Sequence, residues 1–405
     1  MVKAVKVDEE VDVLIIGGGL VGMALLHALK SLNLQIKLVE AKPPLQNQVP
    51  AKQLDTRSIA LSPSSIRLFQ RLGLWTELEA QAAPIKKIHI SEQGKFGQAY
   101  LEQENLREPL GAVAEITALG GVLASGLQKD QILAPATVTS IDKMQGTASI
   151  TLADDSVRTL RAKIIVACDG THSKVRTMCG MDAAHKSYAN CALATNVELC
   201  RPHHHIAYER FTQHGPMALL PLQGNVMGLV WTLTPLDAKA YRDLSDSLFI
   251  DKLQQHFGYR VGRFKAVGQR QVYPLQQMVM PTLNTDRVVF IGNAAHTLHP
   301  VAGQGFNLGL RDVAMLTELI QAEGLSSAML SDYAHARQGD LSVISKSTDG
   351  LVRLFESPLP GLGLARRLGL VVLDNSTFLK RLILRHAKGF GGVVSELICE
   401  QTVDV

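Results

Sequence analysis

The chain has 405 residues, 46% hydrophobic and 19% charged, so it can bury a sizeable core in one large domain or two closely joined ones. The formal net charge is only +4, which implies no overall role in nucleic-acid binding. The five cysteines have no C-x-x-C spacing, which predicts reduced thiols in a cytosolic protein rather than a disulfide framework.

The first apolar run, residues 13–26, has the features of neither a secretory signal nor a membrane span. Glu9, Glu10 and Asp12 precede it, where a signal would carry basic residues. Glycines interrupt the run, and it is too short to cross a bilayer. We therefore expect no transmembrane helix here, and none is predicted elsewhere in the chain.

The N-terminal residues predict a strand, a glycine-rich turn, a helix and a second strand. After the strand at 11–16, Gly17, Gly19 and Gly22 fit the spacing G-x-G-x-x-G. In such a unit the first glycine allows a tight turn, the second lets a pyrophosphate approach the backbone, and the third lets the helix pack on the strand. Glu40 follows Gly22 by 18 residues, as expected for an acid that binds a ribose hydroxyl. The unit predicts an adenine-dinucleotide site.

Arg57 and Asp169 can each be interpreted as binding residues or as structural residues. Arg57 precedes a helix at 63–72, where a cation can offset phosphate charge or lie at the surface beside a helix cap. The buried strand at 163–168 ends in Asp169, at a strand end where ligands gather in open α/β sheets. A purely structural Asp-Gly turn is the alternative for Asp169.

Residues 186–233 contain consecutive strand patterns with no helix between them, which predicts an antiparallel sheet. His203, His204 and His205 lie within this region. Because no Cys, Asp or Glu stands at ligand spacing from them, we expect a solvated loop and no metal site.

A second glycine-rich loop follows the buried strand at 288–291 and leads into a helix. Helix N-termini carry unpaired N–H groups with partial positive charge. Gly303 and Gly305 allow close backbone approach, and Pro300 stiffens the loop. The loop predicts a place for an anion or the polar edge of a ring.

The C-terminal part predicts long helices. Tyr333, Arg337 and Asp340 are spaced as a salt-bridge set on a helix surface. The tail at 351–390 combines apolar residues with seven lysines and arginines against two acidic residues. Basic charge beside an apolar face suits binding at a membrane interface, and packing against the rest of the protein is the alternative.

These elements together resemble the flavoprotein aromatic hydroxylases of the para-hydroxybenzoate hydroxylase type. Their second FAD signature is G-D-A-A-H-x-x-x-P-x-x-G-x-G, and the chain matches it from Gly292 to Gly305 with Asn293 in place of Asp. Residues 169–176 match the family element D-G-x-x-S-x-x-R. The loop is most similar to that of the ubiquinone-biosynthesis hydroxylases, and among these to the 2-octaprenyl-6-methoxyphenol hydroxylases. One departure is that the helix at 116–127 has no Arg to point at the cofactor.

The resemblance implies an α/β (α+β) fold, in which a Rossmann-like FAD domain is interleaved with an antiparallel-sheet substrate domain and followed by a C-terminal helical segment. The expected FAD-domain segments are 1–84, 111–180 and 281–345. The expected substrate-domain segments are 85–110 and 181–280, and the basic, apolar tail is 346–405.

The resemblance also implies one non-covalently bound FAD. The residues expected to bind it are Gly17, Gly19, Gly22, Glu40, Arg57, Asp169, Asn293, Pro300, Gly303, Gln304, Gly305, Phe306 and Asn307. The residues expected to line the substrate pocket are Arg210, Leu220, Pro221 and Trp231. No side chain is assigned as a catalytic acid or base, because the flavin carries the chemistry.

The implied reaction uses NADH or NADPH to reduce FAD, and O2 then forms a flavin C4a-hydroperoxide that hydroxylates a lipophilic prenylated phenol of ubiquinone biosynthesis. The implied location is the cytoplasm, at the inner face of the membrane or with other ubiquinone-biosynthesis proteins. A flavin-dependent reductase of a prenyl lipid and a non-catalytic FAD-bound scaffold are the alternatives.

Overall fold

The computed structural model describes residues 6–43, 54, 57–102, 108–298, 304–356, 362–390 and 393–399. Two residues of the predicted cofactor site, Pro300 and Gly303, lie outside these ranges.

A mainly parallel sheet carries the glycine-rich turns, in the strand order β18-β19-β11-β1-β2-β8, with the hairpin of β9 and β10 attached to β11. Its strands are β1 (Glu9–Ile16), β2 (Ile36–Val39), β8 (Ile132–Leu133), β9 (Ala136–Asp142), β10 (Thr147–Leu152), β11 (Val157–Ala167), β18 (Asn284–Thr285) and β19 (Val288–Phe290). Since β19, β11, β1 and β2 are parallel neighbours, the turns after their carboxyl ends meet along one edge of the sheet.

Helices and a small sheet cover this parallel sheet and share one core with it. The helices are α1 (Leu20–Leu29), α2 (Pro63–Arg71), α3 (Trp75–Glu79), α4 (Ile116–Ala124), α5 (Lys174–Met178), α8 (Gln304–Glu323) and α9 (Ser327–Glu356), and the small sheet holds β3 (Ser58–Leu61), β7 (Gly111–Glu115) and β4 (Ala83–Ile85). Helices α1 and α8 pack closely because a Cβ on Gly309 would lie only 2.8 Å from the side chain of Val21.

The predicted antiparallel sheet is confirmed, in the order β20-β17-β12-β15-β14-β13-β5-β6, with β16 paired to β12 and with β13 and β5 as a parallel pair. Its strands are β5 (Lys87–Glu92), β6 (Gln98–Glu102), β12 (Ala184–Leu199), β13 (Ile206–Thr212), β14 (Gly215–Pro221), β15 (Val226–Leu233), β16 (Phe264–Val267), β17 (Gln271–Val279) and β20 (His296–Thr297). One face packs on α6 (Pro235–Arg242) and α7 (Asp246–Phe257) in a second core cluster.

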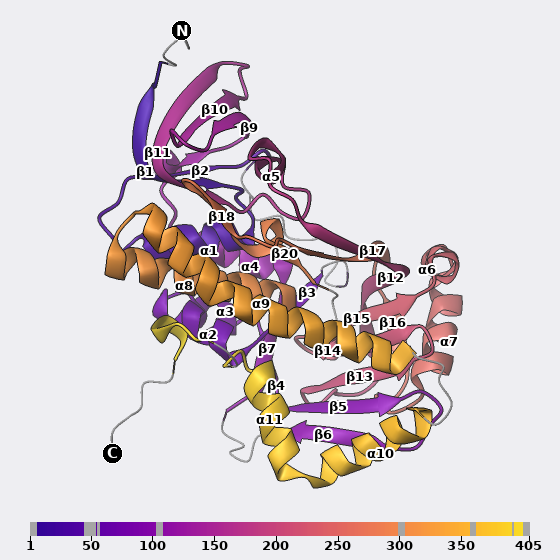
Figure 1. The fold of residues 1–405 in the computed structure, drawn as a ribbon. Helices are drawn as coiled ribbons and strands as arrows, with labels where there is room; N and C mark the ends of the chain where they lie inside the picture. Colours follow the sequence, from indigo (N-terminus) through magenta and orange to yellow (C-terminus); the bar gives the residue numbers. More distant parts are fainter. Residues whose placement is uncertain are drawn as a thin grey trace.

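Figure 1 shows the two sheets toward opposite ends of the molecule, with the long helix α9 running across both of them. The helix contacts β18 of the parallel sheet and β14 of the antiparallel sheet. Helices α10 (Leu362–Asn375) and α11 (Thr377–Ala387) lie beside β5 and β6, far from β9 and β10 (Figure 1). Within the described ranges, no helix combines the length and hydrophobicity needed to cross a membrane.

Candidate active site

The turn after β1 has the shape that a pyrophosphate requires. Gly17 has φ +109°, and a Cβ there would lie 2.5 Å from the carbonyl oxygen of Cys168. A Cβ on Gly22 would lie 2.0 Å from the carbonyl oxygen of Gly17. In contrast, a Cβ on Gly19 would meet no atom within 4 Å. The first N–H groups of α1 therefore face open space, which fits the approach of an anion.

Glu40 follows β2 directly beside this turn. Its Oε2 accepts a hydrogen bond from the Gly18 N–H at 2.6 Å, and its Oε1 accepts one from the Lys42 N–H at 2.9 Å. The two bonds fix the carboxylate at the carboxyl edge of the sheet. This position fits the predicted contact with a ribose hydroxyl.

The turn after β11 holds a carboxylate oxygen that lacks a partner. Asp169 Oδ2 accepts a hydrogen bond from the Val175 N–H at 3.1 Å and so caps α5. Asp169 Oδ1 is buried and has no hydrogen-bond partner among the described residues. Because an unsatisfied buried acceptor is costly, this oxygen fits a donor from a bound ligand, such as a hydroxyl of FAD.

Arg176 ties this turn to the turn after β19. Its Nη1 donates to the Ala294 carbonyl oxygen at 2.9 Å, and its Nη2 donates to the Thr171 carbonyl oxygen at 2.9 Å. The hydroxyls of Thr171 and Thr297 also lie 2.9 Å apart. The arginine of the D-G-x-x-S-x-x-R element therefore holds two loops together.

The turn after β19 and the start of α8 provide the third part of the site. The side chain of Asn293 is exposed, and a Cβ on Gly305 would meet no atom within 4 Å. Gln304 and Phe306 stand beside Gly305 in the first turn of α8 and are partly exposed. This arrangement leaves the N-terminus of α8 accessible to a ligand.

Asn307 has a different place from the one expected. Its Oδ1 accepts hydrogen bonds from the Ser62 N–H at 2.8 Å and the Ser65 hydroxyl at 2.7 Å, and its Nδ2 donates to the Ala60 carbonyl oxygen at 2.9 Å. The side chain thus fastens α8 to the junction of β3 and α2, so only the backbone of Asn307 could serve a cofactor.

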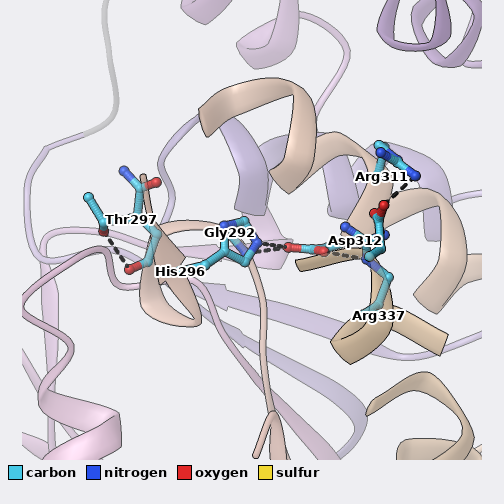
Figure 2. Close-up of polar contacts among 8 residues, drawn as sticks. Gly292, His296, Thr297, Arg311, Asp312 and Arg337 are labelled. Carbon is cyan, nitrogen blue, oxygen red and sulfur yellow. Dashed lines mark hydrogen bonds and ion pairs between the residues drawn. The ribbon is translucent and has the colours of Figure 1, made fainter. Parts of the chain in front are cut away.

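A cluster of buried charged side chains holds the turn after β19 in place through hydrogen bonds to Gly292 and His296 (Figure 2). Asp312 Oδ2 accepts hydrogen bonds from the Gly292 N–H at 2.9 Å and from His296 Nε2 at 2.6 Å. Its Oδ1 accepts one from Arg337 Nε at 2.7 Å. Burial alone would raise the pKa of the Asp312 carboxyl, but His296 and Arg337 outweigh this effect and lower the pKa to about 2.

This cluster corrects the prediction of a surface salt-bridge set. Tyr333 is 0% exposed and Arg337 1% exposed, and Asp340 accepts from Arg337 and pairs with Arg311 at 2.9 Å. Burial would lower the pKa of Arg337, but Asp312 and Asp340 raise it. The i, i+4, i+7 spacing is the same for a buried and an exposed helix face, and besides Asp340 on its own helix Arg337 pairs with Asp312 on α8.

A pocket of about 300 Å³ lies between the antiparallel sheet on one side and the starts of β3 and α4 and the loop after β19 on the other. Most of its lining is apolar. The lining residues are Arg57, Ser58, Ile116, Ala192, Ala194, Thr195, Asn196, Leu229, Val230, Tyr273, Pro274, Leu275, Gln276, Thr297 and Leu298. The guanidinium of Arg57 lies 5.3 Å from the centroid of the Tyr273 ring. A ring bound here would face the loop that carries Asn293.

The structure places none of the four predicted pocket residues in this lining. Trp231 is 1% exposed and packs against Tyr241 and His256 on the opposite face of the sheet. Arg210 donates to the His256 carbonyl oxygen on the same side. Leu220 packs against the apolar cluster to which α10 and α11 contribute, and Pro221 is buried. On β15 the pocket takes Leu229 and Val230 instead, and a one-residue shift along the strand turns the Val230 side chain to the face opposite that of Trp231.

His203 also differs from expectation, because its side chain is buried and not solvated. Its Nε2 donates to the Leu222 carbonyl oxygen at 2.9 Å, so it anchors its loop. Across the described ranges, no three His, Cys, Asp or Glu side chains gather as a metal site would require.

Comparison with known proteins agrees with this site. Residues 10–339 match the family model described as FAD binding domain. The fold matches that of p-nitrophenol 4-monooxygenase from Pseudomonas putida with a TM-score of 0.76 and 19% identity, over 95% of this chain and 99% of that one. The family model identifies an FAD-binding domain, and the shared fold agrees with it.

Two curated relatives narrow this class. The chain is 35% identical to the ubiquinone hydroxylase UbiL of Rhodospirillum rubrum, over 94% of this chain and 90% of that protein. It is 29% identical to the 3-demethoxyubiquinol 3-hydroxylase of Escherichia coli, over 94% of this chain and 99% of that protein. The chain belongs to the flavin-dependent ubiquinone hydroxylases, and the predicted resemblance is confirmed. NAD(P)H and O2 are the usual co-substrates of this family.

The Asn293→Asp substitution is expected to retain FAD, because the exposed side chain keeps an oxygen acceptor at the same place. We expect the flavin content of the purified protein and its affinity for FAD to change by only a few-fold, at roughly 1 kcal/mol or less. Flavin absorbance after purification measures this. A colourless Asn293→Asp protein would show that Asn293 does not face the cofactor as expected.

Proposed function

We propose that this protein hydroxylates the aromatic ring of a polyprenyl phenol in ubiquinone biosynthesis, with NADH or NADPH as reductant and O2 as co-substrate. The observation that carries the proposal is the mostly apolar pocket between the antiparallel sheet and the loop after β19. Bound FAD would supply the oxygen-transfer chemistry. The chain's own residues would position the ring and keep water away from it.

The lining of the pocket suits these tasks. Ala192, Val230 and Leu275 offer apolar surface to a ring. Arg57 brings a positive charge to the same space, which favours negative charge on a bound flavin. The Gly17–Gly22 turn, Glu40, Asp169 and the turn that carries Asn293 would hold the dinucleotide.

The test is turnover of the FAD-loaded protein with prenylated phenols, including methoxyphenols, under labelled O2. We expect oxidation of NAD(P)H that depends on the phenol, and one labelled oxygen atom in the product ring. A reductase would oxidise NAD(P)H without labelling the product, and a scaffold would do neither. Mass spectrometry and NMR of the product identify the ring position.

We also propose that α10 and α11 dock on an anionic membrane surface, from which a polyprenyl phenol is collected. Exposed apolar side chains follow one face of these helices, among them Leu368 (51%), Val372 (55%) and Phe378 (73%). Arg381 and Arg385 are exposed beside them. Apolar surface beside basic charge suits an interface with anionic lipid, and each basic residue contributes about 1 kcal/mol.

Not every basic residue of the tail serves this surface. Arg366 is in an ion pair with Glu92 on β5, and Lys380 is in one with Asp374. Asp374 also accepts a hydrogen bond from the Tyr100 N–H on β6 at 2.9 Å. These contacts hold α10 and α11 on the protein, so the residues that make them are not substituted in the membrane test.

Replacing Arg381 and Arg385 together with glutamine should weaken sedimentation with anionic liposomes by tenfold or more at low salt, from about 1 kcal/mol per residue. The matched control replaces Arg158 and Arg161, which are exposed on β11 at the far end of the molecule from α11. Equal binding by the two double variants, or no binding by the wild type at low salt, would contradict membrane docking.

A further inference from the structure

A row of partly exposed side chains runs across the antiparallel sheet, away from the pocket. Its members are the cross-strand partners Ala194, Val230, Ala218, Glu209 and Ile90, on β12, β15, β14, β13 and β5. All five are partly exposed, whereas most of their neighbours on the opposite face of β14 and β15 are fully buried. Because the first two also line the pocket, the row leads away from the pocket across the same face of the sheet.

Glu209 is the one ionisable side chain in this row. Its neighbours in sequence turn to the other face, where the Tyr208 ring lies 5.7 Å from the Phe257 ring and Arg210 Nε donates to His256 at 3.3 Å. Glu209 therefore points to the pocket side of the sheet. The side chain is only partly exposed, and burial raises the pKa of its carboxyl to about 7.

The residues around Glu209 provide its carboxyl group with few hydrogen-bond or ion-pair partners. No hydrogen bond or ion pair to its carboxyl is found among the residues that the structure describes. Several charged groups on the described elements that border the row are engaged elsewhere, in the pairs Glu92 with Arg366, Asp374 with Lys380, and Asp349 with Lys186. A partly buried carboxyl with no ion pair is unfavourable unless something binds to it, which points to a ligand that brings a donor.

We propose that Glu209 accepts the hydrogen bond from the ring hydroxyl of the phenol substrate. The inference rests on the proposed function and names the side chain that would recognise the phenol. Neighbouring strands lie about 4.8 Å apart, so the backbones of Val230 and Glu209 are roughly 10 Å apart. Ala218 lies between them and its small side chain leaves room for a ring. The hydroxyl of the ring is a donor, and the Glu209 carboxyl only accepts once it is ionised, so binding is compared at a pH above its pKa of about 7.

The test compares binding of a geranylated methoxyphenol and of its methyl ether, which lacks the donor, to the FAD-loaded protein. Flavin absorbance changes give the two dissociation constants. We expect the wild type to prefer the phenol by roughly 10- to 100-fold, the range for a hydrogen bond to a charged group. In Glu209→Met, which keeps the length without the charge, the preference should fall to near one. Glu209→Gln, a neutral acceptor, should lie between them.

The control variant is Glu198→Gln, in which a carboxylate that pairs with Lys265 at the sheet surface is neutralised. It should keep the preference of the wild type. Loss of a buried charge is often neutral or stabilising, so both Glu209 variants should fold and bind FAD. A preference that persists in Glu209→Met and Glu209→Gln overturns the role of Glu209 and leaves the proposed function standing. A wild-type protein that hydroxylates no prenylated phenol overturns both.

Discussion

The Gly19→Val protein is expected to fold normally and to lose FAD. Gly19 is the N-cap residue of α1, with φ −70° and ψ −178°, a conformation open to any residue. A Cβ there would meet no atom of the protein within 4 Å. The side chain would instead fill the space before the helix N-terminus, where the pyrophosphate of a dinucleotide lies.

Overpacking of this kind costs about 1–3 kcal/mol, which is roughly a 5- to 150-fold weaker affinity for FAD. Fluorescence quenching of added FAD measures the affinity, and thermal unfolding of the flavin-free protein measures the fold. Gly22→Val is the matched control, because its Cβ would collide with the carbonyl oxygen of Gly17 at 2.0 Å. That variant should lose stability even without FAD.

The two variants separate binding from folding. If Gly19→Val retains full yellow colour after purification, the pyrophosphate does not approach this turn. If Gly19→Val unfolds as readily as Gly22→Val, Gly19 is required for folding itself, although a Cβ there meets no other atom.

The parallel sheet and its three turns were predictable because their signals are local. Gly22 is required by a contact within its own strand-turn-helix unit, Gly17 by its positive φ and by the carbonyl oxygen of Cys168 on the neighbouring strand's turn, and Glu40 follows the very next strand. The turns after β11 and β19 each follow a short buried run. Parallel pairing then brings the three turns to one edge without further information.

The pocket side of the antiparallel sheet was not predictable in the same way. Trp231 and Val230 are adjacent on β15, and only the position of α7 decides which of them faces the pocket. The sequence pattern of β15 is apolar on both sides, so no alternation marks the face. Glu209 carried a signal that could have been used, because it is an acidic residue in a strand whose neighbours pack in the core.

The roles of Asn307 and Arg337 depend on partners far away in the sequence. Asn307 bonds to Ser62 and Ser65 across more than 240 residues, and Arg337 bonds to Asp312 on the preceding helix. A family motif marks such residues as important without separating contact with a cofactor from support of the loops around it. Side-chain geometry provides that separation.

The Asp312→Asn protein is expected to be the least stable of the variants considered. Asp312 is 0% exposed and accepts hydrogen bonds from Gly292, His296 and Arg337. Asparagine keeps the size but removes the charge, and its amide nitrogen turns a donor toward one of the three donors. Removal of one partner of a buried ion pair leaves the other uncompensated, which lowers the free energy of unfolding by about 3–5 kcal/mol.

FAD affinity should fall as well, because Asp312 holds the N–H of Gly292 (Figure 2) and Asn293 is the next residue of the same loop. Urea unfolding of the flavin-free protein and titration with FAD measure the two effects. Asp332→Asn is the matched control, since Asp332 is exposed on α9 near Arg337 and the substitution is the same. Equal stability of the two variants would contradict a supporting role for the cluster.

Acid sensitivity provides an independent check on the same residue. The folded-state pKa of Asp312, about 2, lies below the ordinary aspartate value of 3.8. Its contribution to the free energy of unfolding is therefore fully present above about pH 4 and is lost as the pH falls through about 2. Asp312→Asn lacks this contribution at every pH. Between about pH 4 and pH 2 its stability should fall less steeply than that of the wild type, and parallel pH curves for the two proteins would show that Asp312 is not held ionised by His296 and Arg337.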